Sequence, residues 1–123
     1  MKLYKEKYDC YLNIDRYQYN NRLYLGLETD EELFCDITIN LPELSLDGDG
    51  TIFLNDDLPR EVREQLEKNG ILSNYLYSVN YNYGRYDCYS VNLDKLKYYD
   101  PIGFDNSNIK LDEVKDLDSN IKI

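Results

Sequence analysis

Carboxylates are the side chains of this sequence that could do the most chemistry, and they are concentrated in one stretch. Residues 28–57 contain ten of them and no Lys or Arg. The other residues hold fourteen acids and fourteen bases, so the formal net charge of −10 at pH 7 belongs to this stretch. Carboxylates can transfer protons, bind hard cations or attract a basic partner. The ten residues are Glu28, Asp30, Glu31, Glu32, Asp36, Glu43, Asp47, Asp49, Asp56 and Asp57.

Catalysis and metal binding receive little support from the surrounding residues. The sequence contains no His, the commonest general base and metal ligand. The run Asp-Gly-Asp-Gly at 47–50 is similar to the start of a calcium loop, but Leu58 occupies the position of the closing Glu. Asp56 and Asp57 precede a predicted helix, whose N-terminus favours negative charge. We expect no enzyme activity, no cofactor and no metal, although carboxylate-only or Lys-based catalysis stays open.

The charge of residues 28–57 has two possible uses. It can act only as a solvated surface that keeps the protein in solution. It can instead imitate the phosphates of a nucleic acid and occupy the basic channel of a nucleic-acid-binding protein, with an affinity that falls as salt is added. For this second use, the partner-binding acids are expected to be Glu28, Asp30, Glu31, Glu32, Asp36, Asp47, Asp49, Asp56 and Asp57.

The negative field also disfavours several other partners. It repels DNA and RNA, whose binding relies on phosphate contacts, and it repels anionic lipid surfaces. No stretch approaches the roughly 20 apolar residues that span a bilayer, and residues 1–7 are charged where a signal peptide is apolar. Cys10, Cys35 and Cys88 are odd in number and far apart, so we expect them to be reduced. These features predict a soluble cytoplasmic protein.

Tyrosines form the second pattern. The chain has fourteen, and between residues 74 and 83 they alternate with other residues as in a β-strand. A helix packed on their side of the strand would bury the rings and leave the hydroxyls at the rim. Alternatively, they form a protein-binding patch, because Tyr is enriched at interfaces. The face is predicted to carry Tyr75, Tyr77, Val79, Tyr81 and Tyr83, and the four tyrosines are the candidate aromatic contacts.

Alternating apolar and polar residues predict an antiparallel meander followed by a hairpin. The turn of the hairpin is expected at Gly84-Arg85, and Pro59 is expected in the first turn of the principal helix. Asn69-Gly70 should end that helix, with Ile71 packing back on Leu66. The predicted strands cover residues 8–19, 23–28, 34–41, 51–54, 74–83 and 86–93, the principal helix 58–68, and a short helical turn 93–99.

The predicted fold class is therefore α+β, with an antiparallel sheet of five or six strands and one principal helix. Residues 1–100 would form a single domain. Residues 101–123 are polar and predict a tail that is a marginal helix or partly disordered. The apolar positions of that tail are Ile109, Leu111, Val114 and Leu117.

Several short motifs carry a family resemblance. They are Asn21-Arg22-Leu23, Ile37-Thr38-Ile39-Asn40-Leu41-Pro42, Leu58-Pro59, Glu67-Lys68-Asn69-Gly70-Ile71-Leu72 and Asp87-Cys88-Tyr89. Through them, residues 20–100 resemble the family called domain of unknown function 4313. Members of that family often sit on plasmids, conjugative elements and phages of Gram-positive bacteria, which implies a mobile-element origin. The family has no agreed activity, so the resemblance implies no catalytic residues.

We expect a small, acidic, non-enzymatic protein of a phage or mobile element. Its predicted role is to bind and inhibit a basic, nucleic-acid-handling host defence protein, as anti-CRISPR or anti-restriction proteins do. The alternative is a structural or interaction module in conjugation or plasmid maintenance that binds a protein partner through its Tyr-rich sheet. A carboxylate-dependent enzyme would instead need several acids that converge in a pocket with a perturbed pKa.

Overall fold

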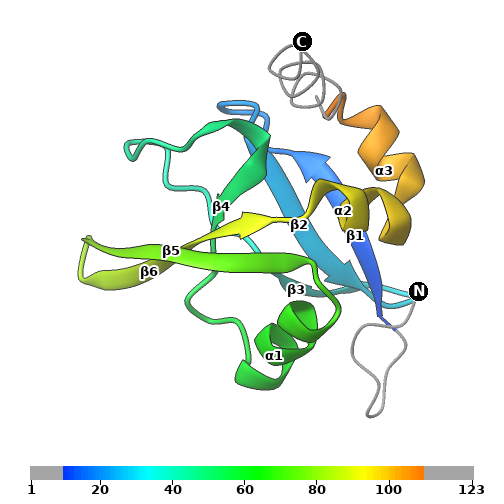
Figure 1. The fold of residues 1–123 in the computed structure, drawn as a ribbon, viewed down its shortest axis with the longest axis horizontal. Helices are drawn as coiled ribbons and strands as arrows, with labels where there is room; N and C mark the ends of the chain where they lie inside the picture. The colour runs from blue at the N-terminus through cyan, green and yellow to red at the C-terminus, as the bar shows by residue number, and fades with distance from the viewer. Residues whose placement is uncertain (1–9, 110–123) are drawn as a thin grey trace, which may run out of the picture.

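Residues 10–109 are described by a computed structural model, in which two three-stranded antiparallel sheets are combined with three short α-helices (Figure 1). The α+β class is confirmed, whereas the single sheet of five or six strands is wrong. The first sheet contains β1 (Tyr11–Arg16), β2 (Leu23–Glu28) and β3 (Leu33–Asp36), and the second contains β4 (Thr51–Phe53), β5 (Leu72–Tyr81) and β6 (Gly84–Val91). The helices are α1 (Arg60–Lys68), α2 (Leu93–Tyr99) and α3 (Pro101–Asn106), and the 3₁₀ turn η1 (Gly48–Gly50) precedes β4.

The predicted third strand over 34–41 is interrupted, because its residues change partner partway along. β3 pairs with β2, and the next N–H, that of Ile37, still donates to the Leu25 carbonyl at 2.9 Å. The Ile39 N–H instead donates to the Phe53 carbonyl of β4 at 3.1 Å. The chain therefore crosses from one sheet to the other here, and two small sheets form in place of one larger sheet.

Thr38 joins the two sheets at this crossing. It forms an isolated antiparallel bridge with Leu54 at the end of β4 and is only 3% exposed. Its Oγ1 accepts a hydrogen bond from the Leu25 N–H at 3.2 Å and lies 2.9 Å from the Tyr17 hydroxyl. A buried hydroxyl must be hydrogen-bonded to avoid a desolvation cost, and this one is satisfied by the first sheet.

The first sheet follows the predicted alternation. β1 and β2 pair with Leu12 opposite Leu27 and Ile14 opposite Leu25, and all four side chains are buried. β1 ends at Arg16, before the end of the predicted strand over 8–19, because Tyr17 and the residues after it turn back toward β2. Residues 8 and 9 of that prediction lie outside the described residues.

The β5–β6 hairpin turns two residues earlier than expected. Tyr81 pairs with Gly84, so the turn consists of Asn82 and Tyr83 rather than Gly84-Arg85. Both turn residues have positive φ, +47° and +68°, as a two-residue type I′ turn requires. Asn adopts positive φ more readily than most residues, so Asn82 fixes the position of the turn.

Helix α1 confirms the principal helix, although it begins at Arg60 with Pro59 as its N-cap. At its C-terminus the Ile71 N–H donates to the Leu66 carbonyl at 3.0 Å, and Gly70 adopts φ +77°. This is a Schellman motif, in which glycine takes the left-handed position without a steric cost. Leu66 and Ile71 are both fully buried in the main apolar cluster. The predicted helix end and its apolar contact are therefore confirmed.

Helices α2 and α3 cover the outer side of β1, and the packed structure continues past residue 100. Asp100 caps α3 by accepting from the Gly103 N–H at 3.1 Å, while its other oxygen accepts from the Ile14 N–H of β1 at 2.8 Å. Phe104 of α3 is buried in the main apolar cluster. Apart from Ile109, the apolar positions of the predicted marginal helix lie outside the described residues.

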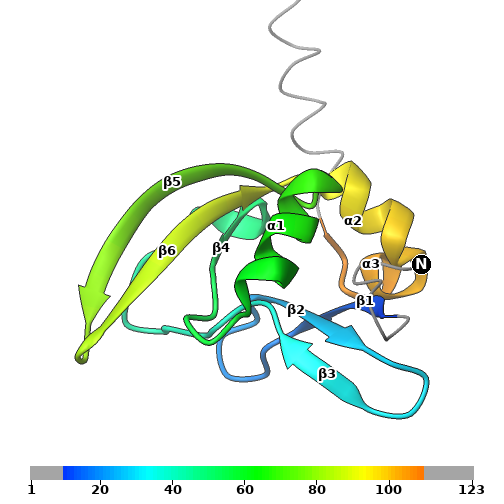
Figure 2. The ribbon, with the colours of Figure 1, turned by 90° about the horizontal axis from the view of Figure 1, so that it is seen from below.

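The two sheets enclose the main apolar cluster, with α1 running from one sheet toward the other (Figure 2). A second, smaller cluster lies beneath the β5–β6 hairpin and contains Leu41, Phe53 and Cys88. No helix within residues 10–109 is both long and apolar enough to cross a membrane.

Candidate partner-binding surfaces

The predicted acidic residues fall in three segments, of which the first and third adjoin, because the Asn55 amide next to Asp56 donates to the Asp36 carbonyl at 3.0 Å. One group surrounds the β2–β3 turn, one lies in the loop before β4, and one lies in the turn before α1. Figures 1 and 2 place the β2–β3 turn and the loop before β4 on opposite sides of the molecule. The nine acids therefore do not share one continuous face. The first group, called the acidic corner below, holds Glu28, Asp30, Glu31, Glu32 and Asp36; the second holds Asp47 and Asp49, and the third Asp56 and Asp57.

The turn of the acidic corner is ordered by Thr29. Its N–H donates to the Glu32 carbonyl at 2.8 Å, and its hydroxyl oxygen accepts from the Glu32 N–H at 3.3 Å and the Glu31 N–H at 3.4 Å. These are the local hydrogen bonds by which Thr stabilises a turn. The exposed carboxylates therefore stand on a defined backbone.

The other two carboxylates of the corner are held by neutral side chains. The Tyr24 hydroxyl donates to Asp36 at 2.6 Å, and the Asn13 amide donates to Glu28 at 2.7 Å. Burial, with the hydrogen bond to Asp36, raises the pKa of Tyr24. Within residues 10–109, no acid of the corner forms an ion pair. Leu33, which is 52% exposed, follows these acids directly, and an apolar contact within a charged rim is typical of protein interfaces.

Asp49 already has a partner inside the protein. Arg16 holds it through two hydrogen bonds of 2.6 and 2.8 Å, and the Arg16 Nε–H donates to the Ser107 carbonyl at 2.9 Å. The hydrogen bond to Asp49 raises the pKa of the Arg16 guanidinium. Asp47 is exposed nearby. This arrangement, the Arg16 clamp, gives Asp49 a structural role and leaves less of the second group available to a partner.

Two clefts bring polar side chains together without gathering the acids. The first, of about 400 Å³, is next to the Arg16 clamp and is lined by the polar residues Arg16, Asn20, Asn21, Asp49, Asn106, Ser107 and Asn108. The second, of about 140 Å³, combines two acids with two arginines and is lined by Leu54, Asn55, Asp56, Leu58, Arg63, Arg85 and Asp87. In the part of the chain that the structure describes, no group of three or more possible ligands could hold a metal ion.

The tyrosines of β5 do not share one face, because the strand contains a bulge. Tyr75 pairs with Tyr89 of β6, but Tyr77 pairs with the next residue, Cys88, so the register shifts between them. Residues directly opposite in an antiparallel pair point to the same side, and a one-residue shift therefore reverses the facing. The predicted common face of the four tyrosines is wrong.

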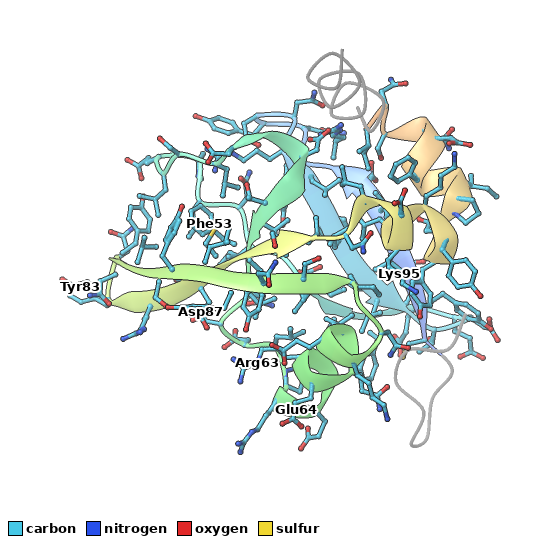
Figure 3. The ribbon with its side chains drawn as sticks, in the orientation of Figure 1. Phe53, Arg63, Glu64, Tyr83, Asp87 and Lys95 are labelled. Atoms are coloured by element: carbon cyan, nitrogen blue, oxygen red, sulfur yellow. The ribbon has the colours of Figure 1, made fainter. Side chains whose placement is uncertain are left out.

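Tyr75 belongs to the side that faces α1. Its hydroxyl lies 2.7 Å from the Ser78 hydroxyl, which donates to Asp87 at 2.6 Å. Arg63 of α1 approaches Asp87 at 3.9 Å, and Figure 3 shows these two side chains on neighbouring elements. The Tyr75 ring also packs edge-on against Tyr89, with centroids 5.8 Å apart. Tyr75 is thus part of a hydrogen-bonded network, although it remains 53% exposed.

Tyr81 lies on the opposite side, with Tyr77. Tyr81 packs against the second apolar cluster, and Tyr77 pairs across the sheet with Cys88 of that cluster. A hydrogen bond with Cys88 raises the pKa of Tyr77. Tyr83 projects fully exposed from the tip of the hairpin, where Figure 3 labels it.

Sequence reasoning missed the two exposed leucines of these surfaces. They are Leu33, which is 52% exposed, and Leu76, which is 46% exposed. The sequence contained a signal for the exposed Leu76, because no charged residue occurs between Asn69 and Gly84.

Taken together, the described residues define a small α+β protein with an acidic corner and a long tyrosine-bearing hairpin. The chain belongs to the family described as domain of unknown function (DUF4313), which matches residues 11–111 and therefore every described strand and helix. The suspected family is confirmed, and the match is longer than the resemblance over 20–100. No curated protein and no solved structure matches the chain.

Proposed function

We propose that this chain is a small non-enzymatic protein of a phage or other mobile element that binds a basic, nucleic-acid-handling defence protein and inhibits it. It would act in the cytoplasm of the host, as anti-CRISPR or anti-restriction proteins do. The observation that supports this proposal is the acidic corner, where five carboxylates stand on an ordered hairpin without an ion-pair partner among residues 10–109.

The positions of the other acids restrict the surface to which such a partner would bind. Asp49 is bound by Arg16, and the loop before β4 lies on the other side of the molecule from the corner (Figure 1). The turn before α1 instead adjoins the corner, because the Asn55 amide donates to the Asp36 carbonyl at 3.0 Å. A protein that imitated a long duplex would need carboxylates in a row along the molecule. The corner offers a short patch instead, in which the negative field would speed encounter and Leu33 would supply apolar contact.

Charge reversal tests the proposal. A triple variant with Asp30→Lys, Glu31→Lys and Glu32→Lys changes the corner. A control with Glu43→Lys, Glu64→Lys and Asp105→Lys changes the net charge by the same amount at exposed acids of the loop after Pro42, of α1 and of α3. Both would be assayed with purified restriction and CRISPR nucleases in DNA-cleavage reactions. We expect the wild type and the control to inhibit one of these nucleases at about 50 mM salt and more weakly at about 200 mM, because the attraction is screened.

The corner variant should lose that inhibition. Equal loss in both triple variants would show that only net charge matters and would contradict the placement at the corner. If the wild type inhibits none of these nucleases at about 50 mM salt, where screening is weak, the proposed function is wrong.

A second candidate function is an interaction module for conjugation or plasmid maintenance that binds a protein partner through the hairpin. The fully exposed Tyr83 at the hairpin tip favours it, because Tyr supplies contact area at a low entropic cost. In this case Tyr83→Ala should abolish capture of the partner, and the corner variant should retain it.

A further inference from the structure

The outer edge of β5 is a long strand edge without a partner strand among the residues that the structure describes. β5 is the longest strand and lies at the end of its sheet, in the order β4-β6-β5. Within residues 10–109 it pairs only with β6. Helix α1 lies near the N-terminal end of β5, and the hairpin extends past the helix toward its tip (Figure 2). The free part of the edge is therefore the half nearer to the turn.

The backbone groups of Ser78 and Asn80 point outward from this edge. A two-residue turn makes Tyr81 and Gly84 a hydrogen-bonded pair. In an antiparallel ladder such pairs alternate with non-hydrogen-bonded pairs, whose N–H and C=O groups point away from the partner strand. The pairs Asn80–Arg85 and Ser78–Asp87 are of the second kind. Their N–H and C=O groups in β5 are thus available to another strand.

The other outer strands of the two sheets are short or already bonded. The Ile14 N–H of β1 donates to Asp100 at 2.8 Å, and the Phe53 carbonyl of β4 accepts from Ile39 at 3.1 Å. β3 has four residues. Short length and bonded edge groups protect a sheet edge, as do bulges and a covering helix. In β5 the bulges and the contact with α1 are confined to the N-terminal half, and the pairing with β6 is regular from Tyr77 to Tyr81.

The edge of β5 also lacks the charges that normally prevent strand pairing. No Asp, Glu, Lys, Arg or Pro occurs between Asn69 and Gly84, although the whole chain carries a net charge of −10. Leu76 and Tyr77 are 46% and 43% exposed. A long edge with apolar and aromatic side chains and no charge is a surface suited to the addition of a strand.

We propose that β5 pairs with the β5 strand of a second copy of this chain. An antiparallel arrangement about a two-fold axis would satisfy both outward backbone rows and join the two hairpin sheets into one sheet of six strands. Two copies with a net charge of −10 repel one another, so they meet most easily through a strand that carries no carboxylate of its own. β5 is such a strand, and Asp87 of the neighbouring β6 accepts from the Ser78 hydroxyl at 2.6 Å and lies 3.9 Å from Arg63. A basic protein would instead be drawn to the acidic corner.

Sedimentation equilibrium of the full chain tests this pairing. We expect a monomer–dimer equilibrium that tightens as salt is added, because salt screens the repulsion between the two acidic copies. Leu76→Lys should weaken the dimer at least about tenfold by placing charge at the edge. The matched control is Ile102→Lys on α3, an apolar residue that is 74% exposed, and it should leave the equilibrium unchanged.

A second variant and a second readout keep the test independent of side-chain effects. Asn80→Pro removes an outward N–H without removing a β5–β6 hydrogen bond, so it should also prevent dimer formation while circular dichroism stays that of the wild type. The Ser78 and Asn80 amides should exchange slowly with solvent in the dimer and rapidly in Leu76→Lys.

Two results would overturn the proposal. One is a chain that stays monomeric up to about 100 µM at every salt concentration, which would leave the edge for a strand of another protein. The other is a dimer that both β5 variants leave intact. Binding to a basic partner weakens with salt, whereas this dimer strengthens, so the failure of one proposal is distinguishable from the failure of the other.

Discussion

Replacing Arg16 is the most informative single test of how this fold is held together. Its guanidinium bonds to Asp49 in two places, to the Ser107 carbonyl at 2.9 Å and to the Asn21 carbonyl at 3.2 Å. These contacts connect the end of β1, the β1–β2 turn, η1 and the end of α3. Arg16→Met keeps much of the apolar stem and removes all of them.

The expected cost follows from the number and burial of these bonds. A hydrogen bond to a charged group contributes about 1.5–3 kcal/mol, and the lower end applies because the Arg16 and Asp49 side chains retain 16% and 23% exposure. Counting only the two hydrogen bonds to Asp49, at about 1.5 kcal/mol each, we expect Arg16→Met to lower the free energy of unfolding by about 3 kcal/mol. This is a large share of the roughly 5–15 kcal/mol typical of a small domain. Asp49→Asn, which keeps one acceptor, should cost about 1–2 kcal/mol.

Urea denaturation followed by circular dichroism measures these values, with an unchanged m-value as the sign that the unfolded states are comparable. The control is Arg60→Met, because Arg60 forms an exposed pair with Glu64 at 3.8 Å; it should cost less than about 0.5 kcal/mol. A double-mutant cycle should give a coupling of about 1 kcal/mol or more between Arg16 and Asp49. If Arg16→Met costs no more than Arg60→Met, the clamp does not stabilise the fold and the reasoning is wrong.

Two further predictions concern the packing at Gly103 and the reactivity of Cys35. A Cβ at Gly103 would meet the Asp100 carboxylate and would lie 2.7 Å from the Ile14 carbonyl oxygen, so Gly103→Ala should cost about 1–3 kcal/mol in urea denaturation. Gly50→Ala, with nothing within 4 Å, is the control and should be nearly neutral; equal costs would refute the role of this contact. Burial, with smaller effects of Cys10 and Asp36, raises the pKa of Cys35 from 9.0 to about 11, so the folded state favours the neutral thiol. That contribution to stability is complete below pH 9 and is lost as the pH rises through about 11. At pH 8, peptide mapping after iodoacetamide treatment should show Cys35 alkylated about a hundredfold more slowly in the folded than in the unfolded chain, and equal rates would contradict the shift.

Local patterns in the sequence were sufficient to predict most of the elements. The alternating leucines of β2 and the end of α1 at Asn69-Gly70 were predicted correctly, because each depends on residues within one turn or strand. The cap of α3 was not predicted, because the domain was expected to end at residue 100 and residues 101–123 were expected to form a tail. Its second contact, with Ile14, depends on tertiary structure and has no local signature.

The division into two sheets and the side of β5 on which Tyr75 lies also depend on tertiary structure, so they could not be predicted from the sequence. Alternation from 34 to 41 is regular, so nothing local indicates that Ile37 and Ile39 bond to different sheets. The β5 bulge likewise leaves the period of two in the sequence intact and changes only the pairing. Among the candidate site residues, the predicted acids are real surface features, but their division into three groups and the neutralisation of Asp49 by Arg16 arise from the three-dimensional arrangement.

The double role of Asp100 has a consequence for the order in which this protein can fold. The bond from Ile14 to Asp100 spans 86 residues, and the bond from Arg16 to Ser107 spans 91. During synthesis on a ribosome, β1 is the first described element to emerge, yet its Ile14 N–H reaches the Asp100 carboxylate only when the start of α3 follows. Contacts of such long range close slowly, because the entropy of ordering the intervening chain is lost before they form. The earliest described strand is therefore completed by the last described helix, and a nascent chain that ends before Asp100 would expose the Ile14 N–H of that strand to other chains.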